Sequence, residues 1–238
     1  MTGKAVKRFW KRATDCAVQG GHTVKLDDKA IRTPAKSSLL VPSRALARAI
    51  AEEWNSQAER VEPATMPITR LANSAIDKVA PQQSQVADMI AAYADADLLC
   101  YRAPDPPVLA QRQAECWDPY LDWAGEVLGA RLRIFSGVVH MPQERAALAR
   151  FSELVHQFKP FELTALHDVV TLSGSLVLGL AALHRFKDVS QVWEASRIDE
   201  TWQIEQWGED ELAKSRADQN FDAFCDACRF YFLNAEKS

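Results

Sequence analysis

The stretch Ser38-Leu-Leu-Val-Pro-Ser-Arg-Ala-Leu-Ala-Arg-Ala-Ile-Ala-Glu-Glu-Trp54 marks the point at which the chain changes character. Ser38–Val41 is typical of a short strand, and Pro42 ends it. Ser43 then suits the N-cap of a helix, because its hydroxyl can accept a hydrogen bond from the first turn. Apolar residues follow at helical spacing: Leu46, Ala49, Ile50 and Trp54. The stretch therefore predicts strands before Pro42 and helix after it.

The residues before this stretch predict a meander of small strands. Phe9–Val18 is strand-like, Gly20-Gly21 supplies a turn, and His22–Asp27 alternates polar with apolar residues. A third strand is expected at Ala30–Thr33, where Pro34 ends it. If the first helix packs across these strands, residues 1–80 form a small α+β domain of two layers.

The residues after it predict helices almost throughout. A helix is expected at Ile68–Val79, and residues 81–238 then form a larger, mainly helical domain, giving an α+β fold class for the whole chain. The expected elements are helices at Gln82–Leu99, Val108–Leu128, Pro142–Phe158 and Thr164–His184, one or two long helices in Ser190–Cys228, and an extended segment at Arg131–Met141.

The overall composition narrows the class of protein. The chain has 238 residues, of which 47% are hydrophobic and 25% charged, and a net charge of −4. This balance argues against nucleic acid as a partner, since phosphate binding usually needs a basic face. The longest apolar run, Leu172–Leu183, is shorter than the roughly 20 residues that span a bilayer, so no stable membrane insertion is expected.

The basic residues near the N-terminus, among them Lys4 and Lys7, are followed by no apolar segment of a secretory signal. The simpler interpretation is a bacterial cytoplasmic protein, with a mitochondrial matrix form as the alternative.

The cysteines predict buried thiols in a reducing compartment. Their number, five, is odd, and the chain is too long for a disulfide-stapled miniature fold. Cys225 and Cys228 form a C-x-x-C motif within a helical pattern, without the preceding strand of a redox site or the second ligand pair of a zinc site. No metal site is expected.

Catalytic and cofactor motifs are lacking. The chain contains no Walker sequence and no G-x-G-x-x-G, so no nucleotide cofactor is expected. His167 and Asp168 could form a general-base pair, but no nucleophile motif accompanies them. The simpler interpretation is a histidine that is hydrogen-bonded near a helix start, and we expect no catalytic residue.

Carboxylates are densest between Asp199 and Glu211, where Trp202 and Trp207 lie among them. Such a run is commonly one solvated helix face. Tryptophan, however, is enriched at protein–protein anchor sites, and neighbouring charge helps to orient a partner. The candidate partner-binding residues are Asp199, Glu200, Trp202, Glu205 and Trp207.

Several phrases of the sequence resemble the assembly chaperones of the alpha subunit of F-type ATP synthase, which occur in mitochondria and α-proteobacteria. The similar phrases keep the family's order along nearly the whole chain: Lys7–Lys11, Val24–Lys36, Ala49–Gln57, Met66–Asp77, Asp95–Arg102, Trp117–Trp123 and Trp202–Gly208. The departures are small: Asp28-Lys-Ala stands where the family more often has Gly-Arg-Pro, and Ser74 where threonine is common.

The resemblance implies a small N-terminal α+β domain, a larger helical domain and a chaperone that works without ATP hydrolysis. It implies the unassembled alpha subunit as partner, a chaperone that is monomeric when free, and functionally sensitive residues around Asp199 and Glu200. The family's Glu-Trp phrase falls on Glu53 and Trp54, and Arg70 and Asn73 lie in another shared phrase. We expect Trp54 on the inner face of the first helix, in the core.

Two other functions stay open. One is a hydrolase that uses His167 and Asp168, which predicts a concave pocket around them. The other is an adaptor for a different protein.

Overall fold

The computed structural model describes residues 7–235, which form two compact units. Unit 1 comprises the chain up to Gln83 together with Pro160–Ala165 and the residues from Arg229 onward, and unit 2 comprises Ser84–Lys159 and Leu166–Cys228. The boundary expected at residue 80 thus lies close to Gln83, but two later segments, expected in the helical domain, pack with unit 1. Lys4 lies outside the described residues.

The sheet of unit 1 is a three-stranded antiparallel meander, β1 (Ala13–Val18), β2 (Gly21–Leu26) and β3 (Lys29–Ala30). Gly21, the first residue of β2 after the turn, has φ 154°, and a Cβ there would lie 2.6 Å from the Val41 carbonyl oxygen. Glycine is therefore required at this turn by both conformation and close approach.

Three of the expected strands differ from the structure. The strand expected at Ala30–Thr33 is the two-residue β3, Lys29–Ala30. Strand β1 begins at Ala13 instead of Phe9, because the backbone N–H groups of Lys11 and Arg12 donate to the Asp27 carboxylate instead of to a sheet ladder. Ser38–Val41 forms no strand but only isolated bridges, His22–Val41 and Arg32–Ser38. The Thr23 hydroxyl donates to the Leu39 carbonyl at 2.6 Å and so occupies one ladder acceptor.

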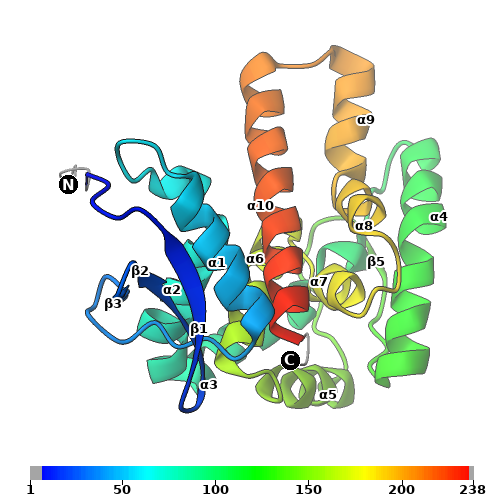
Figure 1. Ribbon diagram of the computed structural model, residues 1–238. Coiled ribbons are helices and arrows are strands. Elements are labelled where there is room, and N and C mark those ends of the chain that lie inside the picture. The colour runs from blue at the N-terminus through cyan, green and yellow to red at the C-terminus, as the bar shows by residue number, and fades with distance from the viewer. Residues whose placement is uncertain (1–6, 236–238) are drawn as a thin grey trace. The chain divides into compact units, whose positions relative to one another are not determined.

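Helix α1 (Arg44–Ser56) packs against this sheet, as the sequence predicts (Figure 1). The Ser43 hydroxyl accepts a hydrogen bond from Leu46 N at 3.1 Å and donates to the Leu233 carbonyl. The core beneath α1 includes Val24, Ile50 and Ile68, and residues of the late segments complete it, since Phe161 and Phe230 stack at 5.9 Å.

The α+β fold class is confirmed by the remaining elements, which are nearly all helical. Unit 1 adds η1 (Pro63–Thr65), α2 (Pro67–Ser74), the π-helical turn η2 (Ala75–Val79) and η3 (Ala80–Gln82). The elements that follow along the chain are α3 (Gln83–Ala91), η4 (Ala92–Ala96), η5 (Leu98–Cys100), β4 (Tyr101–Arg102), α4 (Pro107–Trp123), η6 (Ala124–Leu128), β5 (Phe135–Ser136), α5 (Arg145–His156), α6 (Pro160–Ser173), α7 (Leu176–Leu183), α8 (Val189–Ser196), α9 (Ile198–Trp207) and α10 (Glu211–Ala235). Strands β4 and β5 pair in parallel.

Four helix predictions need correction. The helix expected at Gln82–Leu99 is α3, which ends at Ala91 and is followed by the 3-10 turns η4 and η5. The single helix expected at Thr164–His184 is two helices, because Gly174 takes the left-handed conformation with φ 71° and Ser175 caps α7. Ser190–Cys228 contains three helices, interrupted at Arg197 and at Gly208, which has φ 90°. Helix α5 begins at Arg145, three residues after Pro142.

Cys225 and Cys228 lie on α10, so their helical setting is confirmed. Burial raises the pKa of both thiols, that of Cys228 to about 12, which keeps it protonated and unreactive near neutral pH. All five cysteines are free.

Two kinds of site are lacking within the described residues: a membrane-spanning helix and a cluster of metal ligands. No helix of residues 7–235 is long and apolar enough to cross a membrane. The same part of the chain brings no three histidine, cysteine or acidic side chains together in a way that could hold a metal ion.

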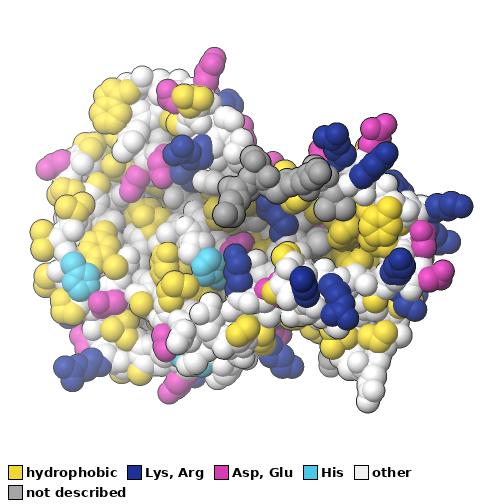
Figure 2. Space-filling model, turned by 90° about the vertical axis from the view of Figure 1, so that its left-hand side faces the viewer, with side chains coloured by type: hydrophobic (Ala, Val, Ile, Leu, Met, Phe, Trp, Pro, Cys, Tyr) yellow, Lys and Arg dark blue, Asp and Glu magenta, His cyan; other side chains and the backbone are white. Residues whose placement is uncertain are grey.

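On the face that Figure 2 shows, basic, acidic and hydrophobic side chains are mixed.

The Glu53 carboxylate holds the N-terminus of α2. Its two oxygens accept hydrogen bonds from Ile68 N at 2.7 Å, Thr69 N at 2.8 Å and the Thr69 hydroxyl at 2.6 Å. A carboxylate at this position satisfies free N–H groups of the first turn and complements the helix dipole.

We therefore expect Glu53→Ala to lower the free energy of unfolding by about 2 kcal/mol, because these donors lose a charged acceptor. Urea titration followed by circular dichroism measures the change. The matched control is Glu52→Ala, which removes only an exposed pair with Arg48 and should change the value by less than about 0.5 kcal/mol. Equal effects of the two variants would contradict this role of Glu53.

Candidate functional site

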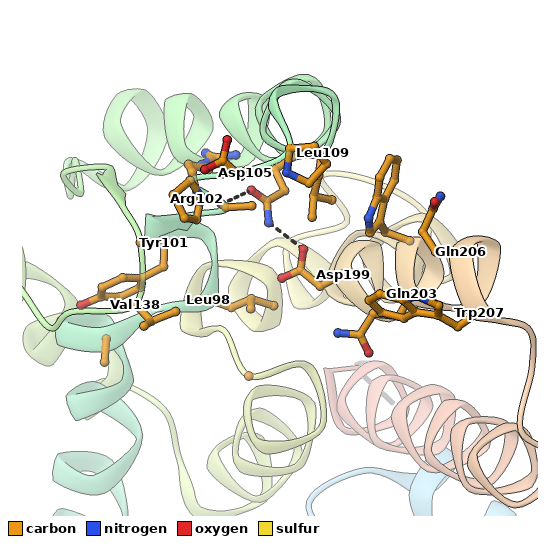
Figure 3. A pocket seen from close by; sticks show the side chains of 18 residues that line it. Leu98, Tyr101, Arg102, Asp105, Leu109, Val138, Asp199, Gln203, Gln206 and Trp207 are labelled. Carbon is orange, nitrogen blue, oxygen red and sulfur yellow. Dashed lines mark hydrogen bonds between the residues drawn. The ribbon is translucent and has the colours of Figure 1, made fainter.

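A groove of about 830 Å³ opens in unit 2. One wall is the segment from Ala96 to Pro106, which includes β4. The start of α4 contributes Leu109 and Gln113, the loop after β5 contributes Gly137 and Val138, and α9 forms the remaining wall. We call this site the α9 groove (Figure 3).

One face of α9 lines the groove. It carries Asp199, Trp202, Gln203, Gln206 and Trp207, which are spaced i, i+3, i+4, i+7 and i+8 and so share one side of a helix. Asp199 and Trp202 are half-buried, whereas the Trp207 side chain is 79% exposed. The structure thus brings three of the five predicted partner-binding residues to one surface.

The other two predicted residues lie outside the lining. Glu200 pairs with Arg197 at 2.8 Å. Glu205 receives two hydrogen bonds from Arg112 of α4, at 2.7 and 2.8 Å, and this bidentate pair lowers the pKa of Glu205. The predicted partner-binding residues are therefore divided: Asp199, Trp202 and Trp207 line the groove, whereas Glu200 and Glu205 are paired with arginines.

The groove also contains an exposed apolar rim. Val138, in the loop after β5, is 93% exposed, and its neighbour Val139 is exposed as well. Of these side chains Val138 lines the groove, and with Trp207 it presents large apolar area to solvent at this concave site. Exposed apolar area of this kind is typical of protein interaction sites.

Two residues that the sequence did not single out are built into the groove. Gln113 of α4 is buried, and its amide bonds both to Ala103 N and to Asp199. Arg102 is 8% exposed; its Nη2 donates to Asp118 at 2.7 Å and its guanidinium lies 5.0 Å from the centre of the Trp117 ring. Arg102 ends one of the phrases shared with the chaperone family, which was the one available signal for it.

Asp97 anchors the wall next to these residues. It is fully buried, and its carboxylate accepts hydrogen bonds from Leu99 N at 3.1 Å, the Ser175 hydroxyl at 2.7 Å and Val177 N at 3.1 Å. These donors join the turn η5 to the first turn of α7. Burial outweighs the hydrogen bonds and raises the pKa of Asp97 to about 6.

The His167–Asp168 pair does not face the groove. His167 Nδ1 lies 2.8 Å from Asp168 Oδ1 on α6, and the two side chains are 36% and 40% exposed. Neither residue lines the α9 groove.

The family-motif residues of unit 1 have structural surroundings. Glu53 holds α2, as described above, and the half-buried Trp54 packs edge-on against Trp10, with ring centres 5.1 Å apart. Arg70 is exposed. Asn73 is half-buried, and its side-chain oxygen is buried without a hydrogen-bond partner among the described residues.

Comparison with known proteins identifies the family. The family model described as ATP12 chaperone protein matches residues 7–125. The chain belongs to the ATP12 chaperone family. A crystal structure of Atp12 from Paracoccus denitrificans is 47% identical, with a TM-score of 0.93 and coverage of 96% of this chain and 98% of that one.

The chain is similar to two further proteins. The Atu1473 protein of Agrobacterium tumefaciens is 42% identical, with a TM-score of 0.92 over 96% of this chain and 86% of that chain. Mitochondrial protein atp12 of Schizosaccharomyces pombe is 22% identical over 214 residues, which cover 85% of this chain and 74% of the yeast protein. The family resemblance seen in the sequence is confirmed, and with it the chaperone function and its place in ATP synthase assembly.

The raised pKa of Asp97 gives unfolding a distinct pH dependence. The ordinary pKa of an aspartate is 3.8, and that of Asp97 in the folded chain is about 6. At pH values between these two, the folded chain holds a proton at Asp97 that the unfolded chain has released. The free energy of unfolding should therefore fall as the pH rises from about 4 to 6, with roughly 3 kcal/mol as the upper limit for this group.

Asp97→Asn cannot titrate, so the stability difference between wild type and variant should change across that pH interval. Chemical denaturation of both proteins at several pH values measures it. A difference that is constant from pH 4 to 6 would show that Asp97 titrates in the folded chain as it does in the unfolded chain.

Proposed function

We propose that this chaperone binds the unassembled alpha subunit of F-type ATP synthase through the α9 groove and prevents its aggregation until beta subunits arrive. The observation that carries the proposal is the single face of α9 that presents Asp199, Trp202 and Trp207 to a groove. Glu200 and Glu205, which flank this face, form ion pairs with Arg197 and Arg112 and give the groove a charged margin that can orient the client during encounter.

The chemistry of the groove suits a segment of an incompletely assembled protein. A lone alpha subunit exposes apolar surface that its neighbours cover in the ring of alternating subunits. Tryptophan side chains can take up such surface, while the amides of Gln203 and Gln206 can exchange hydrogen bonds with an extended main chain. Because the chaperone must release its client, a small mixed surface suits it better than a large apolar one.

We further propose that the activity involves no catalysis and no ATP hydrolysis. The family's relatives are named as chaperones, and the His167–Asp168 pair lies outside the lining of the groove. We also propose that the chaperone is monomeric when free and acts in the bacterial cytoplasm, in line with the two bacterial relatives.

Light scattering of purified alpha subunit, at a temperature where it aggregates, tests the proposal. The chaperone should suppress aggregation at near-stoichiometric ratios without added nucleotide, whereas an unrelated protein of similar charge should not. Undiminished aggregation, together with the lack of a complex in gel filtration, would contradict the proposed client.

Two exposed side chains allow the surface itself to be tested. Trp207→Ala should leave the melting temperature unchanged, because the ring is 79% exposed, but weaken alpha-subunit binding by about 2 kcal/mol, as for an interface hot spot. Val127→Ala removes an exposed side chain outside the groove and should change neither quantity. Isothermal titration calorimetry measures the affinities, and equal affinities of the two variants would place the client elsewhere.

A charge reversal tests the contribution of Glu200 on α9. Glu200→Lys removes a part-buried pair with Arg197, in which the Glu200 side chain is 45% exposed, so stability should change by only about 1 kcal/mol. The association rate for the alpha subunit should fall, and the loss should diminish at high salt. Stopped-flow fluorescence measures the rate. A variant that melts instead would show that Glu200 has a structural role.

A further inference from the structure

Gln113 connects two walls of the α9 groove. It projects from α4 and is 1% exposed. Its Oε1 accepts a hydrogen bond from Ala103 N at 2.7 Å, and its Nε2 donates to Asp199 Oδ1 at 2.6 Å. Figure 3 draws both hydrogen bonds as dashed lines. One buried side chain therefore ties the segment after β4 to α9.

The orientation of this amide is determined by its neighbours. A backbone N–H can only donate, and an ionised carboxylate can only accept. Only one of the two amide orientations satisfies both contacts, namely the one that directs the NH₂ group at Asp199. The same orientation holds one carboxylate oxygen in place.

The second oxygen of Asp199 remains available. Asp199 lines the groove, and its Oδ2 accepts no hydrogen bond from the residues that the structure describes. A carboxylate that is held at one oxygen can bind a donor at the other with little further loss of side-chain freedom.

We infer that Gln113 is a positioning residue of the α9 groove, which holds Asp199 so that Oδ2 meets a lysine or arginine side chain of the client. This inference rests on the proposed function and specifies the chemistry of the client segment: a basic residue within an otherwise apolar stretch.

The charges along the groove favour a basic side chain. Among the residues that the structure describes, Asp105 and Asp199 line the groove with negative charge, and the positive charge of the lining residue Arg102 is offset by Asp118, which accepts from its Nη2 at 2.7 Å. Trp202 follows Asp199 by one helical turn. An aromatic ring beside a carboxylate suits the apolar stem of lysine or arginine and attracts its cationic end.

Gln113→Glu separates positioning from simple charge. When its carboxyl is ionised, the variant keeps an acceptor for Ala103 N but replaces the donor to Asp199 with a second carboxylate. A protonated carboxyl at this buried site would still donate to Asp199, so binding is measured well above neutral pH. Added negative charge alone would strengthen binding of a basic client. Loss of positioning instead drives Asp199 out of place, so we expect about tenfold weaker binding of the alpha subunit, measured by biolayer interferometry.

The matched control is Gln111→Glu, which adds the same charge at an exposed position of the same helix. It should bind the alpha subunit at least as tightly as wild type. If Gln113→Glu also binds as tightly as wild type, or more tightly, the inference is overturned.

Asp199→Asn gives a second line of evidence that does not depend on the folding of the Gln113 variant. It retains an acceptor oxygen for Gln113 but lacks the charge, so affinity should fall about tenfold and become less sensitive to salt. In the Asp199→Asn background, Gln113→Met should cause little further loss, because both changes remove the same interaction.

The outcomes distinguish this inference from the proposed function. If wild type binds the alpha subunit but Asp199→Asn binds equally well, the inference is wrong and the proposed function stands. The same holds if the losses of affinity caused by Asp199→Asn and by Gln113→Met simply add in the double variant. If wild type itself does not bind the alpha subunit, both fail.

Discussion

The buried carboxylate of Asp97 joins two parts of unit 2 that are far apart in the sequence. It accepts hydrogen bonds from its own turn, at Leu99 N, and from the start of α7, at the Ser175 hydroxyl and Val177 N. All eight residues of α7 are buried, so this helix has no exposed face to adjust. The segment that continues from Asp97 into β4 forms a wall of the α9 groove, and its place follows from this anchor.

The same arrangement explains how an exposed binding surface can be built on a firm base. Burial of Asp97 is costly, which is evident in its raised pKa, and several donors together make it tolerable. On this base, Gln113 and the Arg112–Glu205 pair hold α9 to α4. The side chains at the mouth, Trp207 and Val138, are left exposed. The groove is therefore supported from below by buried polar contacts, while its apolar rim is free to meet a client.

Much of the fold could be predicted because the relevant signals are local. The turn at Gly20-Gly21, the cap at Ser43 and the periodicity of α1 each depend on neighbouring residues. The break between α6 and α7 was missed because Gly174 and Ser175 lie inside a long apolar run, and the apolar pattern outweighed the glycine. The decisive partner of Ser175, Asp97, is 78 positions away in the sequence.

The sequence predicts which residues belong to the candidate site, but not which of them line the groove and which are paired with arginines. The run from Asp199 to Glu211 was recognised as a place for a partner. Helical spacing, however, puts Glu200 within about 20° of Trp207 around α9, so spacing alone does not show that Trp207 lines the groove and Glu200 does not. Gln113 carried no such signal, since an isolated glutamine in a helix has no distinctive pattern. Its importance comes from contacts with Ala103 and Asp199 that only the folded chain brings together.

The central claim is that the client lies in the α9 groove, and hydrogen–deuterium exchange of the chaperone with and without the alpha subunit tests it most directly. Exchange should slow in the complex at residues 98–109 and 199–207, which line the groove, and remain unchanged in β1 and β2 of unit 1. Protection confined to residues 7–83, with the groove segments exchanging as in the free protein, would contradict the account.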